Sequence, residues 1–385
     1  MIDYELTSGQ KELRERIALF CAAEIAPSAS ALDSAPRDEA GQIVREALKK
    51  LGKAGYLDLL VKGDFVSQCV AGEELARSCP STFLSAMASG TSFGMAIKSF
   101  GSRAQQDRYL PGIIAGEKIG ALACTEDSAG SDLSRIETRA DLSGDKWTLT
   151  GSKDFVTNAP VADFFLVLAW TDREAGFEKG LSFFVVDRGK PGLDITGTVE
   201  TMGLRGAPVA GIRLSHCIIS AGNLLGKAGE GHAILKCINE WLKISLSAMS
   251  LGIGVACMEV STSYGKSRSA FGKPIGLFEG VGAKLAIMFT NNDLGRMLTL
   301  RAAWSMDRRE ADSSVLTSCA KLFTSESANK TADLAMQVHG GHGYLKGTSI
   351  ERLYRDARFA ELAYGTSEMQ RAFIARDSLN RYKPT

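Results

Sequence analysis

Hydroxyl-bearing and glycine residues follow an apolar run near residue 125, a pattern that suits contact with a polar cofactor. The segment Thr125-Glu126-Asp127-Ser128-Ala129-Gly130-Ser131-Asp132 comes directly after Gly120–Cys124. In most proteins such a turn after a strand is only a loop. At the edge of a site, its backbone N–H groups and hydroxyls can instead bind the polar edge of a cofactor. This segment alone leaves both interpretations open.

The sequence contains none of the common metal-binding, nucleotide-binding or hydrolase motifs. The eight cysteines show no CxxC spacing, and His339 and His342 stand among glycines without a nearby thiolate or carboxylate, so we expect no metal site. The sequence has no GxGxxG between a predicted strand and a helix, no GxxxxGK[ST], no GxSxG and no HExxH. The formal net charge of +1 gives no reason to expect a nucleic-acid partner.

Cysteine usage and the apolar segments favour a cytoplasmic location. Free thiols in apolar surroundings, as at Cys257, fit a reducing compartment. The first ten residues show neither a basic nor an apolar signal region. The most apolar stretch, Ile244–Met258, is shorter than the roughly 20 residues of a membrane span and predicts a buried helix. We therefore expect no membrane insertion.

Three kinds of pattern succeed one another along the 385 residues. Residues 5–116 show helical periodicity, with breaks expected at four prolines: Pro27, Pro36, Pro80 and Pro111. Residues 119–226 are strand-like, with alternation after a turn at 143–145 and with branched and aromatic runs at Phe164–Trp170 and Leu181–Val186. Long helical patterns return after Gly231. On periodicity alone, a generic α+β protein fits equally well.

Further segments narrow the choice of family. In chain order they are Gly151-Ser152-Lys153-Asp154-Phe155-Val156-Thr157-Asn158; Met202-Gly203-Leu204-Arg205-Gly206; Gly226-Lys227-Ala228-Gly229-Glu230-Gly231; Tyr264, Arg268 and Phe271-Gly272-Lys273-Pro274-Ile275; and Gln337 through Gly340-Gly341-His342-Gly343-Tyr344 to Gly365-Thr366-Ser367-Glu368. Together with residues 125–132, in this order and spacing, the chain resembles the acyl-CoA dehydrogenase family over nearly its whole length. The resemblance implies an α+β, mainly α fold. Its parts are an N-terminal helical bundle (1–118), a middle β-barrel or sandwich domain (119–228) and a C-terminal four-helix bundle (229–385).

The resemblance also implies non-covalent FAD. By position, the flavin ring is lined by Leu122, Cys124, Thr125, Gly130 and Ser131 and covered by Phe155, Val156 and Thr157. The pyrophosphate and adenine are gripped, in part from a neighbouring subunit, by Arg268, Phe271, Phe278, Gln337, Gly340 and Gly341, and the site is closed by Thr366 and Glu368. Sharing the cofactor across an interface makes a homodimer or homotetramer part of cofactor binding.

Family members take the α-proton of an acyl thioester with a glutamate while flavin N5 accepts the β-hydride. Here the usual glutamate position is Tyr364, and the alternative position on the long helix is Leu242. A phenol with an ordinary pKa of about 10 is a poor base at neutral pH. The resemblance places the substrate beside Ser131, Glu240, Lys243 and Gly365, with the Tyr364 N–H on the thioester carbonyl.

Three explanations remain open at this point. The chain dehydrogenates an acyl-CoA or acyl-carrier-protein thioester with Tyr364, or a carboxylate from another wall of the cavity, as base. Glu361 is three residues before Tyr364, but its position favours an exposed or salt-bridged carboxylate over a free base. Alternatively, it is a relative that does not dehydrogenate, such as an acyl-CoA desulfinase or a flavin oxidase or monooxygenase. Thirdly, it is a catalytically silent FAD-containing scaffold. The electron acceptor is an electron-transfer flavoprotein or dioxygen.

Overall fold

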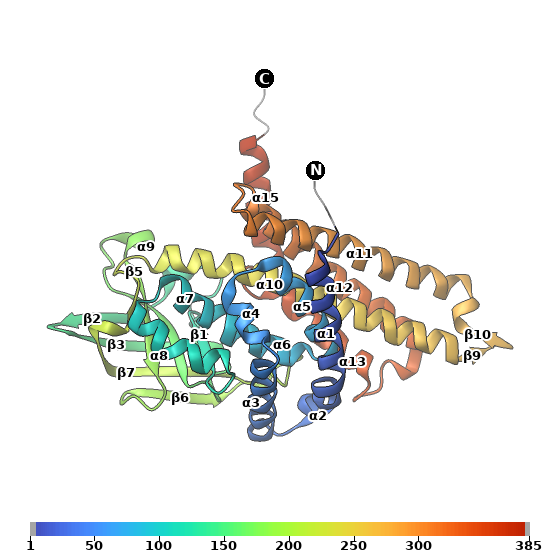
Figure 1. Ribbon diagram of the computed structural model, residues 1–385, viewed down its shortest axis with the longest axis horizontal. Coiled ribbons are helices and arrows are strands. Elements are labelled where there is room, and N and C mark those ends of the chain that lie inside the picture. Colours follow the sequence, from blue (N-terminus) through green and yellow to red (C-terminus); the bar gives the residue numbers. More distant parts are fainter. Residues whose placement is uncertain (1–4, 382–385) are drawn as a thin grey trace.

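The computed structural model describes residues 5–381 and arranges them as helices, then a sheet, then helices (Figure 1). The N-terminal helices are α1 (Ser8–Glu24), α2 (Ala29–Ser34), α3 (Arg37–Lys53), α4 (Tyr56–Lys62), α5 (Phe65–Ser78), α6 (Pro80–Ala86), α7 (Ala96–Phe100) and α8 (Arg103–Ile114). Between α6 and α7 lies the π-helix η2 (Met87–Met95). Capping boxes start α1 at Thr7 and α8 at Ser102, where the cap hydroxyl and a glutamine three residues on satisfy the first N–H groups.

Eight strands form one mixed sheet in the middle of the chain. They are β1 (Gly120–Ala123), β2 (Arg139–Ser143), β3 (Lys146–Thr157), β4 (Phe164–Trp170), β5 (Leu181–Asp187), β6 (Leu193–Thr198), β7 (Val209–Ser220) and β8 (Leu224–Leu225). Their order is β6-β7-β3-β2-β4-β5-β8, with β1 parallel to β4. The short helix α9 (Gly176–Lys179) lies before β5. The branched and aromatic runs at 164–170 and 181–186 are confirmed as the buried strands β4 and β5.

The C-terminal helices are α10 (Gly231–Ser267), α11 (Glu279–Asp307), α12 (Ser313–His339), α13 (Ser349–Ala357), α14 (Phe359–Leu362) and α15 (Ser367–Arg381). A small hairpin of β9 (Ser269–Ala270) and β10 (Lys273–Pro274) joins α10 to α11. The expected α+β, mainly α fold is confirmed, with 62% of the chain helical. Figure 1 places the sheet at one end and the β9–β10 hairpin at the other, with α10 running between them.

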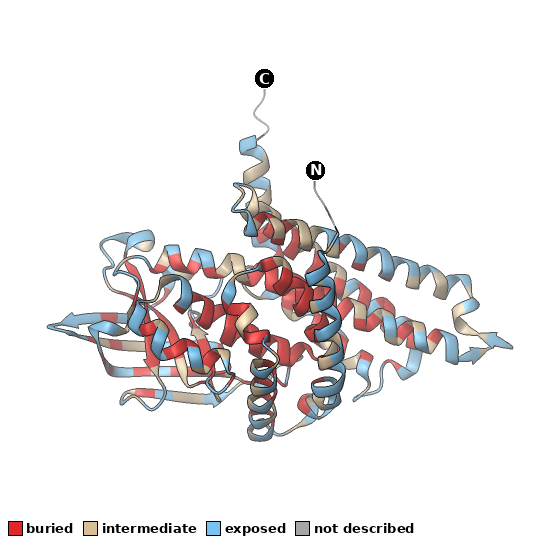
Figure 2. Cartoon of the chain, in the orientation of Figure 1, coloured by how far each residue is buried: buried red, intermediate tan, exposed pale blue. Residues whose placement is uncertain are grey.

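The long apolar helix is the centre of the molecule. Residues of α10 from Leu242 to Gly254 are buried against α5, α11 and α12. Figure 2 shows that buried residues gather in the middle of the molecule. Among the described residues, Ser8–Ser34 and Gly231–Ser267 are helical stretches long and apolar enough to cross a membrane by length and composition alone. The second is 72% buried inside the protein, as a core helix is, so the test is weak support for a span.

One expectation about helix breaks is wrong. Pro111 lies inside α8 instead of interrupting the helical pattern. It sits in the last turn, where losing one N–H donor costs the Asp107 carbonyl a partner but leaves only a few residues to be distorted. Pro36 and Pro80 do stand at helix starts, where a missing N–H is not needed.

Candidate active site

Strand β1 has two faces with different neighbours. Ala121 and Ala123 point into the core of the β-domain, whereas Leu122 and Cys124 are half-buried against the core of the helices. The chain then turns at Thr125, and Glu126 and Ala129 exchange two backbone hydrogen bonds of 3.0 Å. Gly130 and Ser131 are exposed beyond this closed loop. The period-two alternation of a strand thus presents Leu122 and Cys124 toward the helices.

A bulge in β3 creates the neighbouring wall. The register with β7 shifts between Lys153 and Val156, and Phe155 takes a left-handed φ of 54°. Phe155 is 63% exposed, while Val156 lies in the β-domain core and Thr157 is buried. A bulge turns one side chain out of the pleat. Of the three residues expected to cover the flavin, Phe155 presents its ring and Val156 can offer only its backbone.

A buried ion pair holds the two walls together. Lys153 is fully buried and donates to Glu126 Oε1 at 2.8 Å and to the Cys124 carbonyl at 3.1 Å. The Asp154 N–H also donates to the Thr125 carbonyl at 2.9 Å. Burial alone would raise the pKa of Glu126, but the Lys153 ammonium and the hydrogen bonds from Thr138 and the Glu137 N–H lower it. Both charged groups are therefore part of the platform that carries residues 122–125 and 155–157.

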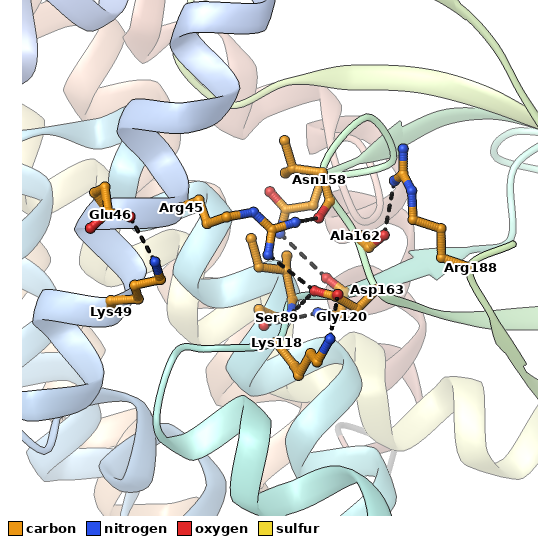
Figure 3. Close-up of polar contacts among 12 residues, drawn as sticks. Arg45, Glu46, Lys49, Ser89, Lys118, Gly120, Asn158, Ala162, Asp163 and Arg188 are labelled. Carbon is orange, nitrogen blue, oxygen red and sulfur yellow. Dashed lines mark hydrogen bonds and ion pairs between the residues drawn. The ribbon is translucent and has the colours of Figure 1, made fainter.

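The β-domain is fixed to the N-terminal helices by the loop after β3 (Figure 3). The Asn158 side-chain amide donates to the Ser85 carbonyl at 2.9 Å and to the Gly120 carbonyl at 3.3 Å. Asp163 accepts from Arg45 of α3 at 3.3 Å and from Lys118 at 3.1 Å. These bonds set the angle between the sheet and the helix that contains the small-residue segment 81–94.

The small-residue segment is tightly packed, as the sequence favours. Every residue from Pro80 to Ile97 is buried. A Cβ added at Gly90 would lie 2.7 Å from Leu60, and one at Gly94 would lie 2.9 Å from Val61. The segment begins in α6 and continues from Met87 as the π-helix η2, a geometry that is frequent at functional sites.

Tyr364 stands in a strained turn between α14 and α15. Its φ is 50° and that of Gly365 is 92°, so two consecutive residues are left-handed, a conformation that costs a tyrosine about 1 kcal/mol or more. Tyr364 packs on the helical core that Leu122 and Cys124 also contact. Burial, and secondarily the Cys124 thiol, raise the pKa of the Tyr364 phenol well above its usual value. Within the described part of the chain, neither the Tyr364 hydroxyl nor the N–H groups of Tyr364 and Gly365 donate a hydrogen bond.

The nearby carboxylates are already engaged. Glu240 pairs with Lys243 at 2.7 Å and accepts from Thr317 at 2.5 Å. Glu361 accepts from Asn329 at 2.7 Å and pairs with Arg358. Leu242 is fully buried in the core. The structure therefore places Glu240 and Lys243 together between α10 and α12, and it gives Glu361 the ion-paired state that sequence reasoning favoured over a free base.

The remaining expected cofactor residues lie at the opposite end of α10. Arg268 and Phe271 follow the helix, are exposed, and Phe271 reaches 95% exposure. Gln337, Gly340 and Gly341 are exposed at the end of α12, which is held to α10 by the stacked rings of Tyr264 and His339, 4.5 Å apart. Phe278 packs edge-on against Phe271. No carboxylate among residues 5–381 pairs with the Arg268 guanidinium.

The second group lies at the end of α10 that is far from the β-domain. Helix α10 begins against β5, where a Cβ at Gly231 would touch Leu181, and it ends 37 residues later beside β9. At 1.5 Å per residue its length is about 55 Å. Thr366 and Glu368 belong to the first group, at the start of α15 next to the Tyr364 turn.

The residues present fit a dinucleotide. An added Cβ at Gly130, Gly340 or Gly341 would meet nothing within 4 Å, so the backbone is open to close approach by phosphates. Two exposed rings, Phe155 and Phe271, can pack on a flavin or an adenine. The guanidinium of Arg268 forms no ion pair within the described residues and can bind a pyrophosphate. With a helical–β–helical fold, these features are those of a flavoprotein, with candidate FAD-binding residues in two separate groups.

Comparisons with known proteins identify the family. The N-terminal, middle and C-terminal domains of acyl-CoA dehydrogenase match residues 7–117, 121–217 and 229–379. The chain is 34% identical to the probable acyl-CoA dehydrogenase YngJ of Bacillus subtilis, covering 98% of this chain and 100% of that protein. It belongs to the acyl-CoA dehydrogenase family of oxidoreductases, which act on CH–CH groups, and its cofactor is FAD.

Two solved structures superpose on nearly the whole chain. Butyryl-CoA dehydrogenase of Megasphaera elsdenii superposes with a TM-score of 0.91 at 28% identity, covering 98% of this chain and 100% of that one. The FAD complex of PigA superposes with a TM-score of 0.86 at 25% identity, covering 99% and 100%.

Sequence reasoning missed two groups around the site. Lys321 of α12 is fully buried and donates to the Gly365 carbonyl at 2.6 Å. Asp356 of α13 is buried and accepts from the Leu204 N–H at 2.5 Å. One feature of the sequence could have indicated that Lys321 is buried, namely that the residues around it at 317–324 are otherwise small or apolar.

Proposed function

We propose that the chain catalyses FAD-dependent α,β-dehydrogenation of an acyl thioester, most simply an acyl-CoA. The observation that carries this proposal is the Tyr364–Gly365 turn, where Tyr364 packs on the same core as Leu122 and Cys124 and where the two N–H groups donate no hydrogen bond within residues 5–381. Backbone N–H groups that await a ligand oxygen stabilise the enolate-like charge that develops on a thioester carbonyl. When bound, FAD supplies the hydride acceptor for the β-hydrogen.

We place the pantetheine chain of the thioester substrate beside α10 and α12 in this proposal. Glu240 and Lys243 form a compact polar pair there, supported by Thr317 and Ser318. Lys243 is 8% exposed, so its charge acts over a short range within the protein. Ser131 and Gly365 complete the proposed substrate contacts. An acyl group on a carrier protein would present the same pantetheine chemistry.

Tyr364 is the proposed catalytic residue, and the direction of its pKa shift predicts how it acts. Because burial raises the phenol pKa, only a small fraction is phenolate at neutral pH. If the phenolate takes the α-proton, the rate of flavin reduction must rise about tenfold per pH unit from pH 6 to 9. A neutral phenol that only donates a hydrogen bond gives a flat profile.

A second candidate follows from the engaged carboxylates. Glu240 and Glu361 both have their partners, so no free carboxylate among them replaces the usual base. This favours a reaction that needs no α-proton removal by a side chain, such as cleavage of a β-sulfinate, in which SO2 leaves and the β-carbon takes a proton, or an oxidase or monooxygenase reaction. A silent FAD-containing scaffold remains the third outcome.

The assembly and the electron acceptor belong to the same proposal. A homodimer or homotetramer would bring Arg268 and Phe271 of one chain to the flavin-ring wall of another. The electron acceptor is proposed to be an electron-transfer flavoprotein, with dioxygen as the alternative for an oxidase, and the location to be cytoplasmic. Neither nucleic acid nor a membrane is a proposed partner.

Anaerobic titration of the purified flavoprotein with straight, branched, cyclic and sulfinate-bearing acyl-CoA thioesters tests the proposal. Bleaching of the flavin together with a product two mass units lighter is the expected result. Spectral perturbation without bleaching, with a product that has lost its β-substituent, would favour the second candidate. Perturbation without any product would identify a binding protein.

A further inference from the structure

A buried lysine lies under the Tyr364–Gly365 turn. Lys321, on α12, is fully buried, and its Nζ donates to the Gly365 carbonyl at 2.6 Å and to the Glu361 carbonyl at 3.5 Å. The side chain of Gln370 also donates to the Gly365 carbonyl, at 3.0 Å. The carbonyl at the tip of the active-site turn therefore accepts two hydrogen bonds from below, while the N–H groups of the turn stay free.

No carboxylate within the described residues forms an ion pair with Lys321. The charged groups that face it are Glu361 of α14, Glu368 of α15, Glu326 of its own helix and Lys243 of α10. Glu361 is itself held by Asn329 and Arg358. Burial, with a smaller effect of Lys243, lowers the pKa of Lys321 to about 8, against the opposing carboxylates. A cation placed in the protein at this cost has a use at the site that it touches.

We propose that Lys321 is a positioning residue whose ammonium holds the Tyr364–Gly365 turn and lends its positive charge to the anion-stabilising N–H groups of that turn. Two consecutive left-handed residues need an external restraint, because the tyrosine would otherwise relax to negative φ. A charge-assisted hydrogen bond to the Gly365 carbonyl supplies that restraint. The same positive charge lies beside the turn and attracts, through space, the negative charge that develops on a thioester oxygen.

The role in anion stabilisation rests on the proposed function, whereas the restraint of the turn does not. A thioester enolate bound at the turn should favour the protonated lysine. The affinity of the enolate form itself, corrected for the proton that the ligand loses, should therefore fall relative to a neutral ligand as pH rises through about 8. A purely structural lysine would affect both kinds of ligand equally.

The test compares two ligands on FAD-loaded protein by the change in flavin absorbance. A 3-oxoacyl-CoA forms an enolate, and the matching 2-enoyl-CoA is a neutral ligand that cannot be oxidised further at the same bond. Lys321→Met should weaken the enolate by about tenfold or more and the enoyl-CoA by less than threefold, and should abolish the pH dependence near 8. Lys321→Arg should retain most of the enolate preference. Lys330→Met, at an exposed position on the same helix, should match the wild type.

Equal weakening of both ligands, or an unchanged pH dependence in K321M, would overturn the anion-stabilising role. Hydrogen–deuterium exchange of residues 361–366 separates this inference from the proposed function, because it needs no thioester. Exchange there should be about tenfold faster in K321M than in K330M. If the wild type binds neither thioester, the proposed function fails while the exchange result still decides the positioning role. Unchanged exchange would refute that role.

Discussion

Removing the buried ammonium of Lys153 should loosen the flavin platform. In Lys153→Met, Glu126 keeps hydrogen bonds from Thr138 and the Glu137 N–H but loses its counter-charge at 2.8 Å. Glu126 is 5% exposed, so water cannot replace the lysine. Stranding one charge of a buried pair costs about 3–5 kcal/mol. The Cys124 carbonyl also loses a donor, so the damage falls on the strand end that carries Thr125.

Urea unfolding and FAD retention measure this effect. K153M should unfold at a markedly lower urea midpoint at pH 7 and should lose FAD during gel filtration. Its pH dependence has a definite sign. Without Lys153, burial raises the folded pKa of Glu126 above its unfolded value, so stability is present at low pH and lost as pH rises through that folded value. K153M should therefore approach the wild type near pH 5.

A second substitution decides whether the stranded charge is the cause. Glu126→Gln in the K153M background removes the charge but keeps an acceptor, and it should recover at least half of the lost stability. Lys146→Met, at an exposed position on the same strand, should change the midpoint little. A K153M protein as stable as K146M, or a double variant no better than K153M, would refute the reasoning.

Three other substitutions test the site and its supports. Tyr364→Glu restores the carboxylate usual in the family, and it should raise the anaerobic rate of flavin reduction by about a hundredfold or more if proton removal limits the wild type. Asp356 has a pKa raised to about 7, mainly by burial, so its stabilisation is full below about pH 4 and is lost as pH rises to 7. Relative to Asp356→Asn, the wild type should lose up to about 4 kcal/mol over that window, measured as a shift in urea midpoint. Arg268→Gln should weaken FAD binding about tenfold, measured by fluorescence on reconstitution, without changing the melting temperature of the FAD-free protein.

Much of the fold could be predicted because its signals are local. The turn at 143–145 and the alternation after it fix β3, and branched and aromatic runs of seven and six residues fix β4 and β5. The long apolar pattern after Gly231 gives α10 because one helix crosses the whole core. Pro111 shows the limit of such signals, because a proline breaks a helix in its interior but is tolerated close to its C-terminal end.

The supports of the site could not be predicted because they depend on tertiary contacts. Nothing in the sequence around Lys321 indicates that its ammonium meets a carbonyl 44 residues later. Likewise, the bond between Asp356 and the Leu204 N–H joins the C-terminal helices to the loop before β7. The left-handed φ of Tyr364 also cannot be predicted from the sequence, because a tyrosine rarely adopts this conformation.

Oxygen polarisation and proton removal are separable in this site. Polarisation needs backbone N–H groups and a turn that holds them, and both are independent of the side chain at residue 364. Proton removal needs a base, and the side chain at 364 is a phenol whose pKa burial raises. Lys321 donates to the carbonyl of this turn, a contact that can support polarisation but not proton removal. On the proposed function, the thioester is bound and polarised at the turn, and the fate of the α-proton is the step that the Tyr364→Glu variant tests.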